Sequence, residues 1–325
     1  MIKNIGYFKD FSDNTIKGVY RVNNSKTIEM SMLYNKIDND VICVPTHYYC
    51  NLGCKMCHLT NSDFSKPMQK IQISEFLECI LDILKKYKTN KKKLLISFMG
   101  VGEPLLNLEL LENVYRVENK IKNVGYDSVS YAISTMMPND NILKLGKLVN
   151  ELNMPIKVHF SMHNPIDSKR KKLIPSTKIN VEDALNMLLI YSYMVRNNKV
   201  IMTNYKKFHQ DNIPIEIHYT LIDGVNDDDK ELKKLIKVLK DYHIPIKFIK
   251  FNPINSLSIS DKEDKWIKEI KNNLIDLKVK KYSPPGREIG SSCGEFTRFF
   301  YMEEILSNND KIEFNKWYIN HLIKN

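Results

Sequence analysis

The feature that most constrains the fold is a regular alternation of strand-like and helix-like segments along the 325-residue chain. Apolar runs rich in β-forming residues lie at 41–44, 94–99, 129–134, 156–161, 215–221 and 246–251. Segments with apolar residues at helical spacing lie at 73–87, 108–121, 141–152, 181–195, 228–242 and 261–274. Six β-then-α units predict an α/β protein with a parallel sheet and right-handed crossovers.

The alternation also suggests where the chain divides. We expect a short β-rich N-terminal extension over residues 1–40, a core over 41–276, and a C-terminal extension over 277–325 with a strand, a loop and one or two helices. In barrel-like parallel sheets the chemistry lies at the C-terminal ends of the strands. Functional residues are therefore sought directly after each predicted strand.

Composition favours a globular, intracellular protein. Hydrophobic residues make up 43% of the chain and charged residues 27%, which is enough for a sizeable core. The sequence contains no apolar run of the roughly 18 to 20 residues that would span a bilayer. The first residues lack the apolar segment of a secretory signal. We expect a cytoplasmic location without membrane contact, where thiols stay reduced.

The formal net charge of +11 raises the prospect of a polyanionic partner. Local basic runs occur at 91–93 and 169–172, and Lys278, Lys280 and Lys281 form a third. Such patches can neutralise phosphates and release counterions. Taken singly, each run is more simply explained as a solvated helix end or loop.

Three cysteines, Cys50, Cys54 and Cys57, form a C-x3-C-x2-C loop directly after the first core strand. Three thiolates leave one iron of a [4Fe–4S] cluster open for a non-protein ligand. A tetrahedral zinc site needs a fourth ligand, and the spacing around His58 does not supply one cleanly. The loop resembles the signature of radical S-adenosylmethionine (SAM) enzymes, while zinc or buried thiols remain the alternatives.

The other predicted strand ends carry small or polar residues. The second strand ends in Gly100-Val101-Gly102-Glu103-Pro104, where glycines allow close approach of a ligand and Glu103 can accept from an ammonium group. Ser134, Ser161 and Asn252 follow later strands. Each alone would be explained by a helix cap or turn, but together they line one rim.

Five segments make the resemblance closer. They are SFMGVGEPLLN (97–107), ISTMMP (133–138), FSMHNPIDSKRKKLIP (160–175), TLIDGVND (220–227) and FNPI (251–254), and their order is similar to that in the RlmN/Cfr family of RNA adenine methyltransferases. The resemblance runs from about residue 28 to about residue 300. It implies a partial (β/α)6 radical SAM barrel with a [4Fe–4S] cluster on Cys50, Cys54 and Cys57. It also implies SAM contacts by Gly102, Glu103, Ser134, Ser161, Met162, His163 and Asn252.

The same resemblance assigns two further cysteines and a carboxylate. Cys293 would carry a methyl group as S-methylcysteine, which becomes a methylene radical and adds to an adenine ring carbon. Cys43, seven residues before Cys50, would then attack the sulfur, release the product and leave a disulfide. Glu29 is the candidate proton acceptor, although an exposed strand glutamate is an equal interpretation. Cys79, inside a predicted helix, is expected to be a buried small residue.

The chain also departs from the family pattern. Only about 27 residues precede the similarity, where the family carries an accessory domain, and 285–289 differ in charge from the family's stretch before the methyl-carrying cysteine. The expected substrate is ribosomal or transfer RNA, methylated at C2 or C8, with a flavodoxin- or ferredoxin-type electron donor and a monomeric enzyme. The alternatives are another acceptor, such as a free nucleotide, and a non-enzymatic iron–sulfur or zinc RNA-binding protein.

Overall fold

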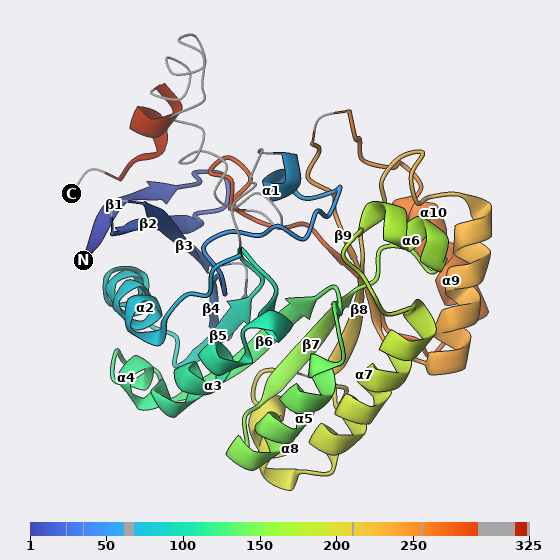
Figure 1. Cartoon of the computed structure of the whole chain (residues 1–325), viewed down its shortest axis with the longest axis horizontal. Helices are drawn as coiled ribbons and strands as arrows, with labels where there is room; N and C mark the ends of the chain where they lie inside the picture. Colours follow the sequence, from blue (N-terminus) through green and yellow to red (C-terminus); the bar gives the residue numbers. More distant parts are fainter. Residues whose placement is uncertain are drawn as a thin grey trace. The chain divides into compact units, whose positions relative to one another are not determined.

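A computed structural model of the chain describes residues 1–23, 25–34, 36–61, 68–209, 211–254, 256–291 and 316–323, with Thr60 and Asn61 described for their backbone alone. The chain divides into two compact units. The first comprises Met1–Asn51, His58–Tyr131 and Pro285–Asn325, and the second comprises Leu52–Cys57 and Ala132–Pro284. Each unit is therefore assembled from segments that are distant in the sequence (Figure 1).

The first unit begins with an antiparallel meander that leads into parallel pairing. Strands β1 (Ile2–Lys9), β2 (Ile16–Val22), β3 (Lys26–Leu33) and β4 (Asp40–Cys43) pair antiparallel in chain order, and β4 pairs parallel with β5 (Lys93–Phe98). The helices are α1 (His58–Asn61), α2 (Ile73–Tyr87), the 3-10 helix η1 (Pro104–Leu106), α3 (Leu108–Arg116) and α4 (Glu118–Lys122). The β-rich N-terminal extension is thus a sheet that continues into the core.

The second unit is a parallel α/β arrangement. Strand β6 (Ser128–Thr135) begins in the first unit and ends in the second. Strands β7 (Ile156–Ser161), β8 (Ile215–Tyr219), β9 (Ile246–Ile249) and β10 (Val279–Tyr282) pair parallel in that order. The helices are α5 (Asn141–Leu152), α6 (Asp167–Leu173), α7 (Val181–Arg196), α8 (Lys199–Lys206), α9 (Asp229–Tyr242) and α10 (Glu263–Asn273).

Side-chain alternation decides which face of these strands the helices cover. In β8, Ile217 and Tyr219 are buried, and the Tyr219 ring lies 5.7 Å from the ring of Trp266 on α10. Glu216 and His218 alternate with them and therefore point to the opposite face. The helices α5, α7 and α9 flank the strands of this unit (Figure 1). The sheet consequently has an apolar, helix-covered face and a polar face.

The described C-terminal segment packs on the first strand. Residues 316–321 are helical, and Leu322 forms a bridge with Phe8 of β1. Phe8 stacks on Trp317 with ring centroids 5.5 Å apart, and both belong to a small apolar cluster with Val19 and Ile289. The two ends of the described chain therefore meet in one unit.

The α/β prediction is confirmed, and the differences are local. The segment 108–121 was expected as one helix but is interrupted at Val117, which separates α3 from α4. Short helices α6 and α8 were not expected, because their apolar faces are too short to show a clear period. Within the described residues, no helix is long and apolar enough to span a membrane.

Candidate active site

The cysteine loop is fastened by its backbone. In the second unit, Cys57 donates its amide to the carbonyl of Cys54 at 3.0 Å, and Lys55 donates to the carbonyl of Leu173 at 2.9 Å. Gly53 lies in the left-handed region with φ of +73°. Cys54 and Cys57 are half-buried, as is Cys50 at the end of a first-unit segment. Three partly exposed thiols on a held loop suit iron–sulfur ligation.

The glycine-rich turn after β5 packs against the loop that follows β4. Gly102 has φ of +107°, and a Cβ there would lie 2.4 Å from Nδ1 of His47 and 2.6 Å from Oγ1 of Thr46. Any side chain at this position would therefore collide with a neighbouring loop. Burial lowers the pKa of His47 to about 4, with Lys70 adding to the effect, so the imidazole is neutral at pH 7.

Glu103, the residue expected to hold the SAM amino group, is 2% exposed. Its Oε1 accepts the amide of Leu105 at 3.1 Å and so caps η1. One carboxylate oxygen of Glu103 therefore has a local role as a helix cap. A role toward SAM stays a prediction that this cap does not oppose, because a carboxylate has several acceptor sites.

Two predicted SAM contacts of the second unit lie together. Ser134 is the penultimate residue of β6 and Ser161 is the last residue of β7. Their Oγ atoms are 3.1 Å apart. Met162 is fully buried next to them, and Asn252, after β9, is 4% exposed. Small hydroxyls and buried residues at neighbouring strand ends are what the rim interpretation requires.

His163 completes this group with a fixed orientation. It has φ of +52°, and its Nδ1 accepts the backbone amide of Thr220 at 3.0 Å, which leaves the proton on Nε2. Burial is the main cause that lowers the pKa of His163 to about 3, and the nearby His218 and Arg170 contribute to the same shift. The side chain is therefore a neutral imidazole with one defined donor.

Arg170 is the residue of this region that the sequence interpretation missed. It lies in a basic run expected to be solvated, yet it is 1% exposed. Its guanidinium donates to the carbonyls of Met136 at 2.7 Å and Met162 at 3.1 Å, and to Oγ1 of Thr177 at 2.5 Å. Burial lowers its pKa to about 10, so it remains charged at pH 7. It ties the ends of β6 and β7 together, and no local pattern in the sequence signals this.

In the first unit, the predicted resolving cysteine and proton acceptor share one sheet face. Cys43, on β4, is 5% exposed and pairs in register with Ser31 of β3. Glu29 lies two residues before Ser31 and therefore on the same face. It is 1% exposed, so the alternative of an exposed strand glutamate is wrong. Oε2 of Glu29 lies 2.7 Å from Nζ of Lys17 on β2. We call Lys17, Glu29, Ser31 and Cys43 the carrier face.

The stretch that precedes Cys293 docks on this face. Oγ of Ser31 donates to Oγ of Ser291 at 2.9 Å, and Nζ of Lys17 donates to the carbonyls of Ile289 and Gly290 at 3.2 Å each. Two aspartates of the meander hold the start of the stretch: Asp13 accepts the amide of Gly286 at 2.7 Å, and Asp10 accepts that of Glu288 at 3.0 Å. Residues 286–291 are therefore anchored along their length.

Cys293 itself lies outside the described residues. Among the cysteines that the structure describes there is no disulfide bond, and the disulfide expected between Cys43 and Cys293 involves a residue outside that part of the chain. Cys79 is fully buried in α2, as expected. Burial is the main cause that raises the pKa of its thiol, and the charge of the nearby Glu78 raises it as well. It therefore has the environment of an inert core residue.

The polar face of the second unit carries a second charged group. His159, Glu216 and His218 offer ligand atoms within 4.8 Å of one another, a grouping that could hold a metal. However, Nζ of Lys247 lies 2.5 Å from Oε1 of Glu216, and Lys280 is paired with its Oε2. These ammonium groups already form ion pairs with both carboxylate oxygens and would repel a metal cation. We interpret the histidine–lysine face, defined as these five residues with Lys157, as a charge-compensated network.

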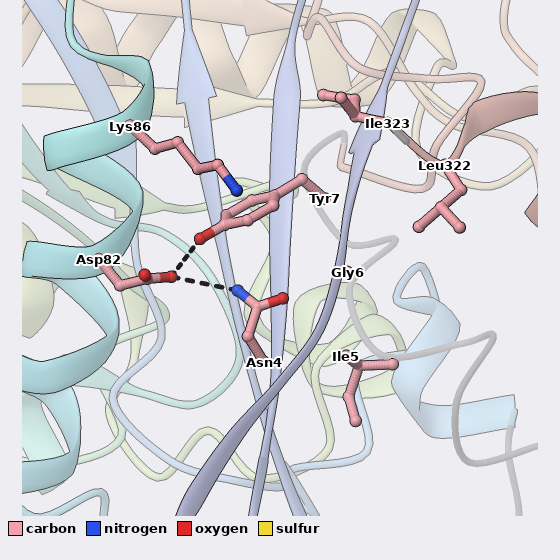
Figure 2. Close-up of a pocket in the computed structure, with 8 residues that line it drawn as sticks. All are labelled: Asn4, Ile5, Gly6, Tyr7, Asp82, Lys86, Leu322 and Ile323. Carbon is pink, nitrogen blue, oxygen red and sulfur yellow. Dashed lines mark hydrogen bonds between the residues drawn. The ribbon is translucent and has the colours of Figure 1, made fainter. Parts of the chain in front are cut away.

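A cavity of about 390 Å³ lies elsewhere in the first unit, between β1, α2 and the C-terminal segment (Figure 2). Figure 2 shows Tyr7 and Asn4 both directed toward Asp82, with the amide of Asn4 donating at 3.1 Å. Nζ of Lys86 lies 4.6 Å from the Tyr7 ring centre. The polar groups that line the cavity thus contact one another, and none of the predicted site residues is among the lining residues.

Comparisons with known proteins agree with this geometry. Curated proteins from Thermotoga maritima and Finegoldia magna, both named Probable dual-specificity RNA methyltransferase RlmN, are similar to the chain. The first is 28% identical over 290 residues, covering 87% of this chain and 76% of its own. The second is 26% identical over 305 residues, covering 90% and 78%.

A radical SAM methyltransferase from Sphaerobacter thermophilus has a similar solved structure. The TM-score is 0.71 at 18% identity, and the match covers 90% of this chain and 80% of that one, which shows a shared fold. The model of the radical SAM superfamily matches residues 44–236, which include the cysteine loop and the ends of β5, β6 and β7. Because that match covers more than half of the chain, the protein belongs to the radical SAM superfamily, whose members use a [4Fe–4S] cluster and SAM.

Proposed function

We propose that this protein is an RNA methyltransferase that adds a methyl group to a ring carbon of adenine through an S-methylcysteine at Cys293. The observation that carries the proposal is the carrier face. The stretch that leads to Cys293 is bonded through Ser291 to Ser31, and Ser31 is the register partner of Cys43. Ser291 is two residues before Cys293 in the sequence, and its hydrogen bond to Ser31 supports the pairing of the two thiols.

The chemistry requires two thiols with separate tasks. Cys293, as a thiolate, takes a methyl group from SAM by displacement. Cys50, Cys54 and Cys57 would hold the cluster, which with a second SAM would supply the one-electron chemistry for removing a hydrogen atom from this methyl group and for taking up the electron that the adduct later loses. The Cys293 methylene carbon then bonds to the electrophilic ring carbon and ties the RNA to the protein.

Release of the product falls to the residues of the carrier face. Glu29 is the candidate acceptor of the proton that leaves the ring carbon, after the adduct has lost one electron. The Cys43 thiolate attacks the sulfur of Cys293, the sulfur–carbon bond breaks, and its electron pair passes to the methylene carbon, which takes a proton and becomes the methyl group. The sulfurs are left as a Cys43–Cys293 disulfide, which a reductant of thiol class must reopen.

The cysteine loop and the rim residues fit the cofactors of this reaction. Cys50, Cys54 and Cys57 would hold the cluster. Gly102 and Glu103 of the first unit, and Ser134, Ser161, Met162, His163 and Asn252 of the second, would contact SAM. The defined Nε2 donor of His163 and the hydroxyl pair Ser134–Ser161 are suited to hold a polar ligand.

RNA as the acceptor is supported by the names of the similar curated proteins and by the net charge of +11. A free nucleotide would be modified by the same residues and is the second candidate. Mass spectrometry of nucleosides from total RNA of cells with and without the protein separates the two. A methylated adenosine that disappears with the protein supports RNA, and an unchanged RNA pool supports the free nucleotide.

The proposed mechanism is tested by Cys43→Ala. This variant can still methylate Cys293 and add to the base, but it cannot release the product, so it should accumulate a covalent protein–RNA adduct. The adduct should survive denaturation and disappear after digestion with RNase.

Two variants serve as controls for this trap. Cys43→Ala/Cys293→Ala should give no adduct, because the carrier sulfur is missing. Cys79→Ala removes a buried thiol of the same unit without touching the carrier face and should behave as wild type. Release of methylated product by Cys43→Ala at the wild-type rate would show that Cys43 is only a strand residue.

A further inference from the structure

Lys17 is an unusual residue because a full ammonium group is enclosed in the first unit. It is 1% exposed, on β2, and its register partner is Ser31 of the carrier face. A buried charge is costly unless it is paired and its hydrogen bonds are satisfied. An apolar residue would therefore be expected at position 17 unless the charge of Lys17 has a function.

The hydrogen-bond donors of the Lys17 ammonium group all have acceptors nearby. An ammonium group has three N–H donors, and three acceptors lie within reach. They are Oε2 of Glu29 at 2.7 Å and the carbonyls of Ile289 and Gly290 at 3.2 Å each. One donor is thus used for the carboxylate, and two are used for the backbone of the stretch before Cys293.

The two carbonyls are not held by ordinary secondary structure, because residues 283–291 contain no strand or helix apart from a turn. Ile289 is fully buried against Phe8 and Val19, so its backbone carbonyl enters the unit and needs a donor there. Lys17 supplies that donor from a neighbouring strand. The same ammonium group orients the carboxylate of Glu29.

We propose that Lys17 is a positioning residue that couples the predicted proton acceptor Glu29 to the backbone that carries Cys293. This inference rests on the proposed function and deepens it. A single rigid cation fixes the carboxylate and the carrier stretch relative to one another, so that both can serve the same adduct. The competing interpretation is that Lys17 only neutralises Glu29.

The two interpretations separate when both partners are removed. Lys17→Met/Glu29→Met replaces the buried ion pair with apolar side chains of similar length, a change that is often tolerated. If Lys17 only neutralises Glu29, the double variant has nothing left to neutralise and Cys293 should be methylated normally. If Lys17 positions the carrier stretch, two backbone carbonyls lose their donor and methylation of Cys293 should slow by about tenfold or more.

The first measurement is the rate at which Cys293 gains a methyl group from SAM, followed by peptide mass spectrometry on the protein with its cluster assembled. This step precedes any proton removal, so a slower rate in the double variant cannot come from the missing proton acceptor. Lys17→Arg retains donors for the carbonyls and should recover part of the rate. Arg21→Met removes a cation from the same strand and serves as the matched control.

The second measurement is hydrogen exchange of the peptide that covers residues 286–291. Its amides should exchange about tenfold faster than in the wild type in the double variant, and at the wild-type rate in Arg21→Met. Wild-type methylation together with wild-type exchange in a folded Lys17→Met/Glu29→Met protein would overturn the inference. Absence of methyl on Cys293 in the wild type would instead refute the proposed function, and the exchange comparison would still decide whether Lys17 docks the stretch.

Discussion

The buried carboxylates Glu29 and Glu216 are neutralised in different ways. Glu29 lies 2.7 Å from one ammonium group, Lys17, whose other donors serve the backbone before Cys293. Glu216 is contacted by Lys247 at 2.5 Å and by Lys280, and Lys157 lies 3.6 Å away. Within the residues that the structure describes, one cation of the carrier face serves two groups, whereas the histidine–lysine face gathers several cations around one anion.

This difference predicts which face is sensitive to single substitutions. A cation that serves two groups cannot be replaced by a neighbour, while one of several cations can. Burial alone would raise the pKa of Glu216, but hydrogen bonding by His218 and the charges of His159 and Lys247 bring it well below its usual range. Glu216 therefore stays ionised, and more than one lysine ammonium group lies close to it. We expect single substitutions on the carrier face to have large effects on activity and stability, and single substitutions on the histidine–lysine face to have small ones.

The largest expected effect is on product formation. Cys293→Ala should retain the cluster and SAM binding but reduce methylated product below detection, because the atom that carries the methyl group is gone. His218→Gln, on the histidine–lysine face, should change turnover less than about tenfold, since it touches no proposed reacting atom. Nucleoside mass spectrometry and iron analysis of both variants provide the comparison. A dead His218→Gln protein that folds normally would place the second face in the chemistry.

A smaller effect is expected on folding. Lys17→Met takes the ammonium group away from a buried carboxylate and two backbone carbonyls, and it should lower the free energy of unfolding by about 3–5 kcal/mol. Lys247→Met leaves Lys280 and Lys157 near Glu216 and should cost only about 1 kcal/mol. Urea denaturation at pH 7 measures both. Equal losses in the two variants would remove the distinction between the faces.

The smallest effect per residue concerns pH. Burial is the main cause that lowers the pKa of His218 to about 4, from an unfolded value of about 6.5. Between these values the unfolded chain binds more protons, so the free energy of unfolding should fall as pH drops from 6.5 to 4. The loss should be about 1–2 kcal/mol for such a residue between pH 7 and pH 5.

Denaturation of variants at both pH values tests this dependence. His218→Gln should show a shallower decline than wild type, because one buried neutral imidazole has been removed. His243→Asn, at an exposed position after α9, is the matched control and should leave the decline unchanged. Hydrogen exchange should further show that acid loosens the histidine–lysine face before the carrier face. The reverse order would contradict the assignment of the titrating residues to the second unit.

Much of the fold could be predicted because its signals are local. Apolar alternation marked the strand Ile156–Ser161, and helical spacing marked Asn141–Leu152, each with the bounds later observed. The interruption at Val117 was missed, since its neighbours keep an apolar period across the break. The strand ends that carry Gly102, Ser134 and Ser161 were foreseen because function in such sheets gathers at one edge.

The sequence by itself determined the superfamily, through a three-cysteine loop and an α/β order that places this loop after a strand, and it predicts roles for two further thiols. Only the tertiary structure decided which charged residues are buried and what they hold. Lys17 and the carbonyl of Ile289 are 272 positions apart, and Arg170 sits in a run of lysines that resembles a solvated surface. Long-range partners leave no periodic trace in a sequence, because burial and hydrogen bonding are set by the packing of distant segments rather than by the residues on either side.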